Sequence, residues 1–268
     1  MSKLGVVEDT LFVPMLGRIY ASEHYPQILY DKKALELKNK LPSDLIEQNK
    51  QNQYTLLASA SRSANMDRII RAFLERRPDG VIVQLGCGLE TTYHRCDNGK
   101  THWYAVDLPH VIEYRRGLLP EPERECYISG NAFAKDWIKK VRDEVLDTPI
   151  LVIAGGLFHY FEENKVIALL RMIGQFGNME VVFDTVNRKG MAMMQKKYMR
   201  QVGHADAQMF FYVDAVEELA AKIGGNAKVI ADEPYYRYIP KNGLKMSTKV
   251  SMAVSDRFCM VKMIQLKL

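Results

Sequence analysis

The stretch 81–109 constrains the fold of this chain more than any other part of its sequence. It opens with the short apolar run VIVQL at 81–85, whose β-branched residues are typical of a strand buried on both faces of a parallel sheet. Gly86 and Gly88 follow directly, and glycine lets the backbone turn tightly and lets a ligand approach the main chain. We therefore expect a buried strand that ends in a ligand-binding turn.

A helix start and a second strand come next. Thr91 and Thr92 can begin a helix, whose free N–H groups and positive dipole end would then face the glycine turn. The second strand is expected at 102–106 and ends at Asp107, about 20 residues past the glycines. A carboxylate at the tip of the second strand suits the hydroxyl pair of a ribose. The pattern therefore predicts a nucleoside-containing ligand.

Two kinds of nucleoside ligand compete for this site. Dinucleotide enzymes use G-x-G-x-x-G, in which the third glycine allows close packing over a pyrophosphate, and this chain has Thr91 at that position. S-adenosylmethionine has no phosphates and does not need the third glycine, so we favour it over NAD(P). A tight turn that binds nothing is the third interpretation, and it would leave Asp107 without an evident partner.

The segments LGCGLETTYHR and WYAVDLPHVIEYRR resemble the leucine carboxyl methyltransferase superfamily, in its bacterial branch similar to the tetracenomycin polyketide O-methyltransferase. Glu90 stands where the family usually has Asp, and the resemblance extends from about Arg62 to the C-terminus. It implies a class I S-adenosylmethionine-dependent methyltransferase. The expected fold is α/β: a Rossmann-like sheet with an antiparallel C-terminal strand, a helical N-terminal extension and a lid insertion.

The expected organisation is a single methyltransferase domain over 1–268. Within it we expect a helical extension at 1–75, a cofactor-binding core at 76–186, a lid at 187–212 and the C-terminal part of the sheet at 213–268. Leucines at helical steps support the extension, with a break at Pro42, and a longer helix is expected at 53–76. Further strands are expected at 125–128, 149–154, 179–183, 228–231 and 258–266, with helices at 111–118, 162–173, 213–223 and 244–254.

Arg62, on the predicted helix 53–76, is a candidate for the cofactor's carboxylate. The family places an arginine shortly before an A-F-L like Ala72-Phe73-Leu74, and a planar guanidinium can pair with a carboxylate through two hydrogen bonds. The alternative is a solvated arginine. Lys32 and Lys33 are weaker candidates for the same anion.

The family implies further cofactor contacts at the ends of four strands. The complete predicted set is Arg62, Gly86, Cys87, Gly88, Asp107, Leu108, Asn131, Ala132, Ala154 and Gly155. Asn131 stands where relatives usually have Asp, but an amide both donates and accepts and can still bind the adenine edge. Gly155 stands where many relatives have Glu, so backbone groups would have to replace that contact.

Methyl transfer is an in-line displacement, for which the protein mainly positions the acceptor and excludes water. A phenol or alcohol acceptor also needs a proton removed, whereas a carboxylate does not. His159, after the central strand, and His204, in the predicted lid, are the best-placed bases, although a lone histidine is often structural. Tyr160 and Asp184 are weaker options.

The segment 187–212 is rich in methionine and aromatic residues, which suits either a helix packed on the core or a lid over an apolar acceptor. Basic residues there keep a carboxylate acceptor open: Arg188, Lys189, Lys196, Lys197 and Arg200. The predicted function is O-methylation of a small-molecule hydroxyl or carboxyl group. The alternatives are methylation of a protein C-terminal carboxyl, an NAD(P)-binding oxidoreductase and a non-catalytic interaction module.

Composition excludes several other classes. The net charge of +5 is spread along the chain, so no nucleic-acid partner is expected. The four cysteines form no C-x-x-C pair and suggest reduced thiols in a cytoplasmic protein. The spacing of Cys87, His94, Cys96 and His102 matches no common zinc pattern, so no metal is expected. No apolar run reaches the ~20 residues that cross a bilayer, so no membrane association is expected either, and 1–10 lacks the apolar core of a signal peptide.

Overall fold

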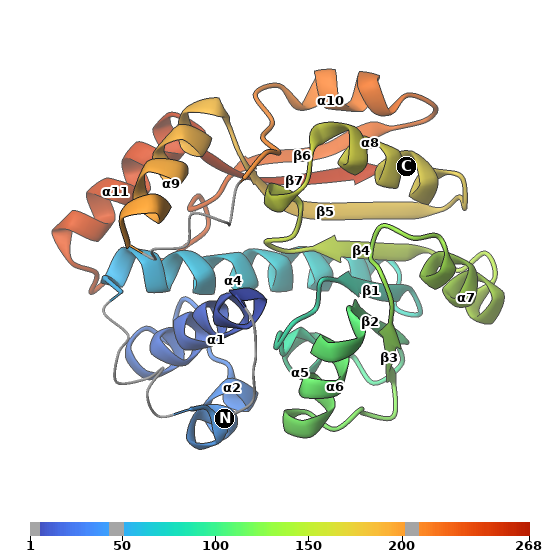
Figure 1. Cartoon of the computed structure of the whole chain (residues 1–268), viewed down its shortest axis with the longest axis horizontal. Coiled ribbons are helices and arrows are strands. Elements are labelled where there is room, and N and C mark those ends of the chain that lie inside the picture. The colour runs from blue at the N-terminus through green and yellow to red at the C-terminus, as the bar shows by residue number, and fades with distance from the viewer. Residues whose placement is uncertain (1–5, 43–50, 202–208) are drawn as a thin grey trace.

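The computed structural model of the chain describes residues 6–42, 51–201 and 209–268, with side chains described for 11–42, 51–195 and 209–268. Its centre is a seven-stranded sheet in the order β3-β2-β1-β4-β5-β7-β6 (Figure 1). The strands are β1 Val81–Leu85, β2 Trp103–Asp107, β3 Glu125–Ser129, β4 Ile150–Ala154, β5 Met179–Val186, β6 Lys228–Pro234 and β7 Val261–Lys267. Strands β1 to β5 are parallel, and β7 runs antiparallel to both β5 and β6. The predicted sheet with an antiparallel C-terminal strand is confirmed.

The strand order reverses at the centre of the sheet. From β1 the chain moves outward to β2 and β3, and then returns to the other side of β1 with β4. All five residues of β1 and of β4 are buried, as expected for strands covered on both faces. The loops after β1 and β4 therefore leave the same edge of the sheet at its switch point, where open α/β sheets bind ligands.

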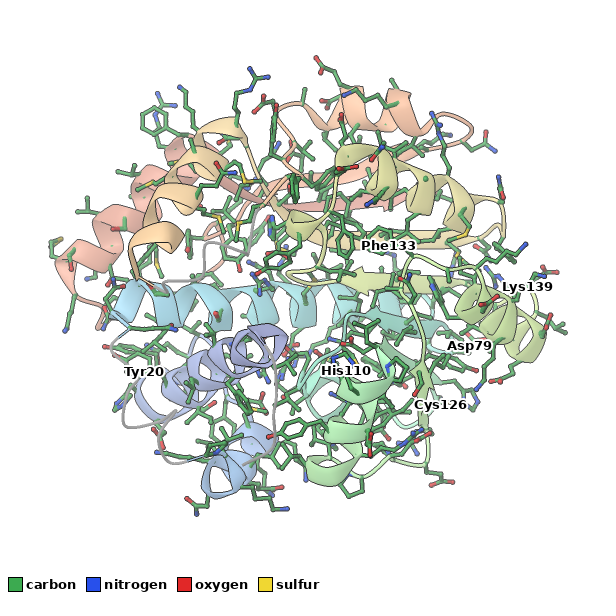
Figure 2. All side chains as sticks on the ribbon, in the orientation of Figure 1. Tyr20, Asp79, His110, Cys126, Phe133 and Lys139 are labelled. Atoms are coloured by element: carbon green, nitrogen blue, oxygen red, sulfur yellow. The ribbon has the colours of Figure 1, made fainter. Side chains whose placement is uncertain are left out.

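Helices cover both faces of this sheet, and their apolar side chains fill the two layers (Figure 2). One face packs against α7 Asp136–Val145, α8 Glu163–Gly174 and α10 Val216–Ile223. The other packs against α4 Gln53–Arg76, α5 Thr92–Cys96 and α11 Met246–Arg257. The helix α6, Pro109–Leu118, places Ile112 against Ala105 and Tyr127 near the outer strands. The helices expected at 53–76, 111–118, 162–173, 213–223 and 244–254 are present, with ends shifted by a few residues.

The described part of the N-terminal extension is helical, as predicted. It contains α1 Val6–His24, α2 Lys32–Leu37 and the short 3-10 helix η1 Lys38–Lys40. The helix α1 lies against α4 (Figure 1), and at their crossing a Cβ on Gly17 would stand 2.6 Å from the Leu56 carbonyl oxygen. The chain leaves helical geometry at Leu41, which is extended, as the following Pro42 requires.

In the parts of the chain that the structure describes, no helix combines the length and the apolar character needed to cross a membrane.

Candidate active site

The glycine turn after β1 adopts a conformation that requires glycine. Gly86 has φ of +61° and Gly88 has φ of +45°, both in the left-handed region. A Cβ on Gly86 would stand 2.9 Å from a methyl group of Leu157, and one on Gly88 would stand 2.9 Å from a methyl group of Leu11. The turn is thus enclosed between α1 and the loop that follows β4.

Asp107 lies directly against this turn. Its Oδ2 accepts a hydrogen bond from the Gly88 N–H at 2.8 Å, and its Oδ1 accepts one from the Leu108 N–H at 2.8 Å. Burial raises the pKa of Asp107, although these two N–H groups act against that increase. The structure therefore brings the glycines and the acid of the predicted nucleoside site together.

Glu90, which follows the turn, is held by two arginines. Its Oε2 lies 3.0 Å from Nη1 of Arg18, and its Oε1 lies 2.9 Å from Nη2 of Arg95. Ser63 also donates to Oε2 at 2.9 Å. Burial acts to raise the pKa of Glu90, but Arg18 and Arg95 outweigh it and hold that pKa well below its usual range.

Two further acids complete a buried cluster, the Glu90 network, made of Arg18, Asp31, Asp67, Glu90 and Arg95. Arg95 binds both carboxylate oxygens of Asp67, at 2.8 and 3.0 Å, and lies 2.7 Å from Asp31. Arg18 lies 3.1 Å from the same Asp31 oxygen. Because these residues come from α1, the start of α2, α4, α5 and the glycine turn, the network joins the N-terminal helices to the turn.

Arg115 supports the turn from its other side. It is fully buried, and its Nη1 donates to the carbonyl oxygens of Gly88, at 3.1 Å, and Glu90, at 2.6 Å. Its Nη2 lies 3.3 Å from Glu125 of β3. From sequence, this arginine is notable only for its place near the end of a helix, whereas the structure uses it to hold the carbonyl groups of the glycine turn.

A second cluster lies at the carboxyl ends of β4 and β5. Nε of Arg62 lies 2.8 Å from Oδ2 of Asp184, and the Gly156 N–H donates to Oδ1 of Asp184 at 2.6 Å. Burial acts to raise the pKa of Asp184, but Arg62 outweighs it and holds that pKa well below its usual range. A Cβ on Gly156 would stand 2.6 Å from Nη1 of Arg62, so the guanidinium lies directly over the Gly155–Gly156 turn.

His159 joins this cluster from η2, the 3-10 turn Phe158–Tyr160 after β4. Only 3% of the residue is exposed, and its Nε2 lies 3.3 Å from Oδ2 of Asp184. Its other ring nitrogen, Nδ1, is buried and has no hydrogen-bond partner among the described residues. The structure thus brings two sequence candidates, Arg62 and His159, into contact with a third, Asp184.

The predicted adenine contacts follow β3 at the same edge. The Asn131 side chain is exposed, and its Oδ1 accepts from the Phe133 N–H at 2.9 Å. Ala132 is buried, and its carbonyl accepts from the Trp137 indole N–H at 2.9 Å. Both residues therefore belong to an ordered turn beside the ribose candidate, since the Gly130 N–H donates to the Asp107 carbonyl at 2.8 Å.

The methionine-rich segment begins with α9, Arg188–Gln201, which packs against the end of β5. Met191 and Met209 are buried in one apolar cluster with Val186, and Tyr160 and Tyr212 pack against it. The burial of Met191 fits a helix docked on the core, while the lid stays a prediction. His204 and the side chains of Lys196, Lys197 and Arg200 lie outside the described residues.

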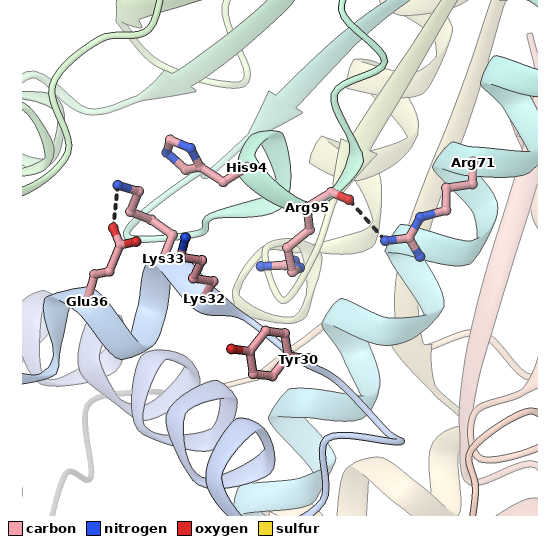
Figure 3. Close-up of a pocket in the computed structure, with 7 residues that line it drawn as sticks. All are labelled: Tyr30, Lys32, Lys33, Glu36, Arg71, His94 and Arg95. Carbon is pink, nitrogen blue, oxygen red and sulfur yellow. Dashed lines mark hydrogen bonds and ion pairs between the residues drawn. The ribbon is translucent and has the colours of Figure 1, made fainter.

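The two weaker candidates for binding the cofactor's carboxylate lie elsewhere. Lys32 and Lys33 line a groove of about 350 Å³ on the outer side of α2 and α5, together with Tyr30, Glu36, Arg71, His94 and Arg95 (Figure 3). Lys33 is paired with Glu36 at 2.7 Å. Neither Arg62 nor the glycine turn lines this groove, so the two lysines are separate from the candidate carboxylate site.

The cysteines of the chain are all free thiols. Burial raises the pKa of Cys87 and of Cys96, which lie in different apolar clusters. Within the described ranges, no three His, Cys, Asp or Glu side chains are grouped so that they could hold a metal ion.

With this geometry in place, comparison with known proteins gives a consistent result. The family model for leucine carboxyl methyltransferase matches residues 7–174. The chain belongs to the leucine carboxyl methyltransferase family. The tetracenomycin polyketide synthesis O-methyltransferase TcmP of Streptomyces glaucescens is 30% identical over 186 residues, which span 69% of this chain and 67% of TcmP.

Solved structures show the same fold. A DUF574 family protein from Streptomyces avermitilis superposes with a TM-score of 0.60 at 12% identity, covering 94% of this chain and 96% of that one. Magnesium protoporphyrin IX methyltransferase (ChlM) from Synechocystis, with bound SAH, gives a TM-score of 0.50 at 10% identity, covering 96% and 98%. The leucine carboxyl methyltransferase family member described here is thus an S-adenosylmethionine-dependent methyltransferase with the class I fold.

Proposed function

We propose that this methyltransferase transfers the methyl group of S-adenosylmethionine to a hydroxyl or carboxyl oxygen of a small molecule. The observation that carries the cofactor part is the contact between Asp107 and the Gly88 N–H at the switch point of the sheet. The relation to a polyketide O-methyltransferase, across two thirds of each chain, supports the acceptor part.

The residues at this edge fit the cofactor. The glycine turn, which includes Cys87, would lie against the donor, and Asp107 and Leu108 would face the ribose. Asn131 and Ala132 would meet the adenine. Arg62 would hold the carboxylate over the Gly155–Gly156 turn, which Ala154 precedes. In this arrangement the donor supplies an activated methyl group, and the chain positions the acceptor and excludes water.

The acceptor would lie beyond Arg62, toward the cluster of Met191, Met209, Tyr160 and Tyr212. Methionine side chains adapt to apolar surfaces, and tyrosine offers an apolar ring with a polar tip. Such a lining suits a small aromatic or apolar acceptor better than the polar backbone of a peptide tail. Methylation of a protein C-terminal carboxyl is the competing function.

The test separates cofactor from acceptor. Isothermal titration with S-adenosylhomocysteine should show saturable binding, and NADH should show none. Incubation with radiolabelled S-adenosylmethionine and a cell extract should then place the label in the small-molecule fraction. Label confined to a protein band would replace this proposal with protein carboxyl methylation, and binding of NADH alone would favour an oxidoreductase.

A further inference from the structure

We propose that the groove on the outer side of α2 and α5 binds a small phosphate-bearing molecule, at a site separate from the methyl-transfer site. The groove has a volume of about 350 Å³. Pockets that hold small molecules range upward from about 300 Å³, so the groove has room for more than a single inorganic ion. This site is independent of which acceptor the enzyme methylates.

The cations of the groove come from three elements that the fold brings together. Lys32 and Lys33 begin α2, Arg71 lies in the last turns of α4, and His94 and Arg95 lie on α5. In Figure 3 the two lysines lie on one side of the Arg95 side chain, and Arg71 lies on the other. Positive side chains from separate parts of the sequence therefore surround one space.

Arg95 forms a fixed floor of the groove and has no donor left for a ligand. Its Nε and Nη2 donate to the two carboxylate oxygens of Asp67, at 2.8 and 3.0 Å. Its Nη1 donates to Asp31 at 2.7 Å and to Thr91 at 2.8 Å, and Nη2 also donates to Glu90 at 2.9 Å. A guanidinium has five N–H donors, so these bonds use all of them. A ligand must therefore bind the other cations of the lining.

Lys32 and Arg71 supply the positive charge that is available to a ligand. Lys32 is exposed, and no carboxylate of the described residues lies within ion-pair distance of it. Arg71 donates from Nη2 to the Arg95 carbonyl at 3.1 Å and lies 3.6 Å from Asp67, while 54% of its side chain is exposed. Glu36 is the only acid among the described residues that line the groove. The lining therefore presents an excess of positive charge.

Two titratable groups of the lining indicate the same excess. Burial lowers the pKa of His94, and the charges of Lys33 and Arg115 lower it further, against smaller opposing effects of Asp31 and Glu36. The hydrogen bond from Lys33 and its charge lower the pKa of Glu36. Both directions are those expected in a positive electrostatic potential.

A phosphate group suits these donors better than a single carboxylate does. A phosphate monoester carries a charge of about −1.5 to −2 at neutral pH, and its three terminal oxygens can accept from ammonium and guanidinium groups at once. The planar fork of Arg71 can bind two of these oxygens. Tyr30, which is 60% exposed, also lines the groove and offers an aromatic ring to the organic part of a ligand. An organic phosphate that carries a flat ring therefore matches both features.

The first test is calorimetric titration of the full chain with saturating S-adenosylhomocysteine, so that no nucleotide can enter the donor site. Inorganic pyrophosphate and ADP, without Mg²⁺, should both bind, and adenosine should not. Tighter binding of ADP than of pyrophosphate supports stacking on Tyr30, whereas equal affinities support the phosphate site and overturn that role of Tyr30. Absence of binding by both phosphates, or adenosine binding as tight as that of ADP, would overturn the proposal.

Variants of exposed residues then locate the site. Lys32→Met should weaken pyrophosphate binding about tenfold or more, the effect of one charged hydrogen bond. Glu36→Gln should strengthen it, because the change removes an acid and releases Lys33. Lys40→Met, an exposed change on η1 outside the groove, removes the same charge as Lys32→Met and should have little effect. Equal losses in the two lysine variants would reveal a nonspecific charge effect and overturn the site.

The same Lys32→Met variant tests whether the groove is separate from the donor site. Its Kd for S-adenosylhomocysteine should equal that of the native chain, since Lys32 does not line the glycine turn or contact Arg62. A weakened Kd would assign Lys32 to the donor's carboxylate and overturn the separate site.

Proton NMR of the histidine rings gives a readout that does not depend on a variant. Saturation with pyrophosphate should raise the pKa of His94, because a nearby anion stabilises the imidazolium. The resonances of His102, which is exposed before β2 and does not line the groove, should not move. An unchanged pKa of His94 at saturation would place the bound pyrophosphate elsewhere and overturn the proposal.

Discussion

At the scale of single residues, Asp107 carries the clearest prediction. In Asp107→Asn a charged hydrogen bond to the ribose is lost, which is worth about 1.5–3 kcal/mol, or about a tenfold to 150-fold rise in Kd. Titration calorimetry with S-adenosylhomocysteine measures this. Asp143→Asn, an exposed change on α7, is the matched control. An unchanged Kd in Asp107→Asn would mean that the carboxylate only supports the glycine turn.

Arg62 requires a more careful variant, because it also balances the negative charge of Asp184. Arg62→Ala leaves a buried carboxylate unpaired, which costs about 3–5 kcal/mol of stability for a buried pair. Arg62→Lys keeps the charge but loses the planar fork that binds a carboxylate through two bonds. We expect Arg62→Lys to weaken S-adenosylhomocysteine binding by about tenfold, a typical charged hydrogen bond, and to leave adenosine binding unchanged. Equal losses for the two ligands would make Arg62 purely structural.

The residue scale also shows where sequence reasoning stops. The glycines and Asp107 could be predicted because their spacing follows from one strand–turn–helix–strand unit. The Arg62–Asp184 pair joins positions 122 residues apart, and Arg18 and Glu90 are 72 residues apart. Only the folded chain brings such residues together. Taken alone in the sequence, each of these charged residues is indistinguishable from an ordinary surface charge.

At the scale of elements, periodicity predicted most helices and strands, since each buries a regular apolar face. The helix expected at 53–76 is α4, and the strands expected at 228–231 and 258–266 are β6 and β7, which pair antiparallel. Ends were less predictable, because pairing extends strands beyond their apolar run. The strand expected at 179–183 continues to Val186, which pairs with Val261. The role of α1 was not predicted. This helix is held to the glycine turn by the ion pairs of the Glu90 network, and no periodic pattern in the sequence indicates those pairs.

That network leads to a prediction about α1. Arg18→Met removes one of the two arginines that hold Glu90 and should cost about 3–5 kcal/mol, as breaking a buried ion pair does. Hydrogen exchange should rise over 11–24. Lys38→Met breaks the exposed pair between the start of η1 and Glu23 of α1, and it should cost about 1 kcal/mol or less. Equal hydrogen exchange over 11–24 in the two variants would contradict the proposal that Arg18 anchors α1.

Glu90 should make stability depend on pH. Its pKa in the folded protein lies below the unfolded value of about 4.3. The ionised Glu90 therefore makes its full contribution to the free energy of unfolding above the unfolded pKa. That contribution is lost as the pH falls from the unfolded pKa toward the lower folded pKa, because the unfolded chain then binds the proton more readily. We expect the difference in unfolding free energy between the native chain and Glu90→Gln to shrink below about pH 4. Glu75→Gln, an exposed change on α4, should show no such trend in urea titrations.

At the scale of the whole molecule, the sheet ties the C-terminal part of the chain to the cofactor edge. The family match ends at residue 174, yet β7 pairs with β5 from Glu180 to Val186. The last residue, Leu268, donates its N–H to the Met179 carbonyl at 2.9 Å. Without β7 and β6, β5 would become an open edge of the sheet. We therefore predict that 1–268 behaves as one cooperative unit.

Calorimetry with and without S-adenosylhomocysteine tests this prediction. A ligand at about 100 times its Kd stabilises the folded state by about 2.7 kcal/mol, which for a chain of this size raises Tm by about 5–10 °C. The whole unfolding peak should move as one, although the ligand would contact only the carboxyl edge of β1 to β4. Asp107→Asn should move less at the same concentration. Two separate peaks, of which the ligand shifts one, would show instead that the sheet does not couple its C-terminal strands to the site.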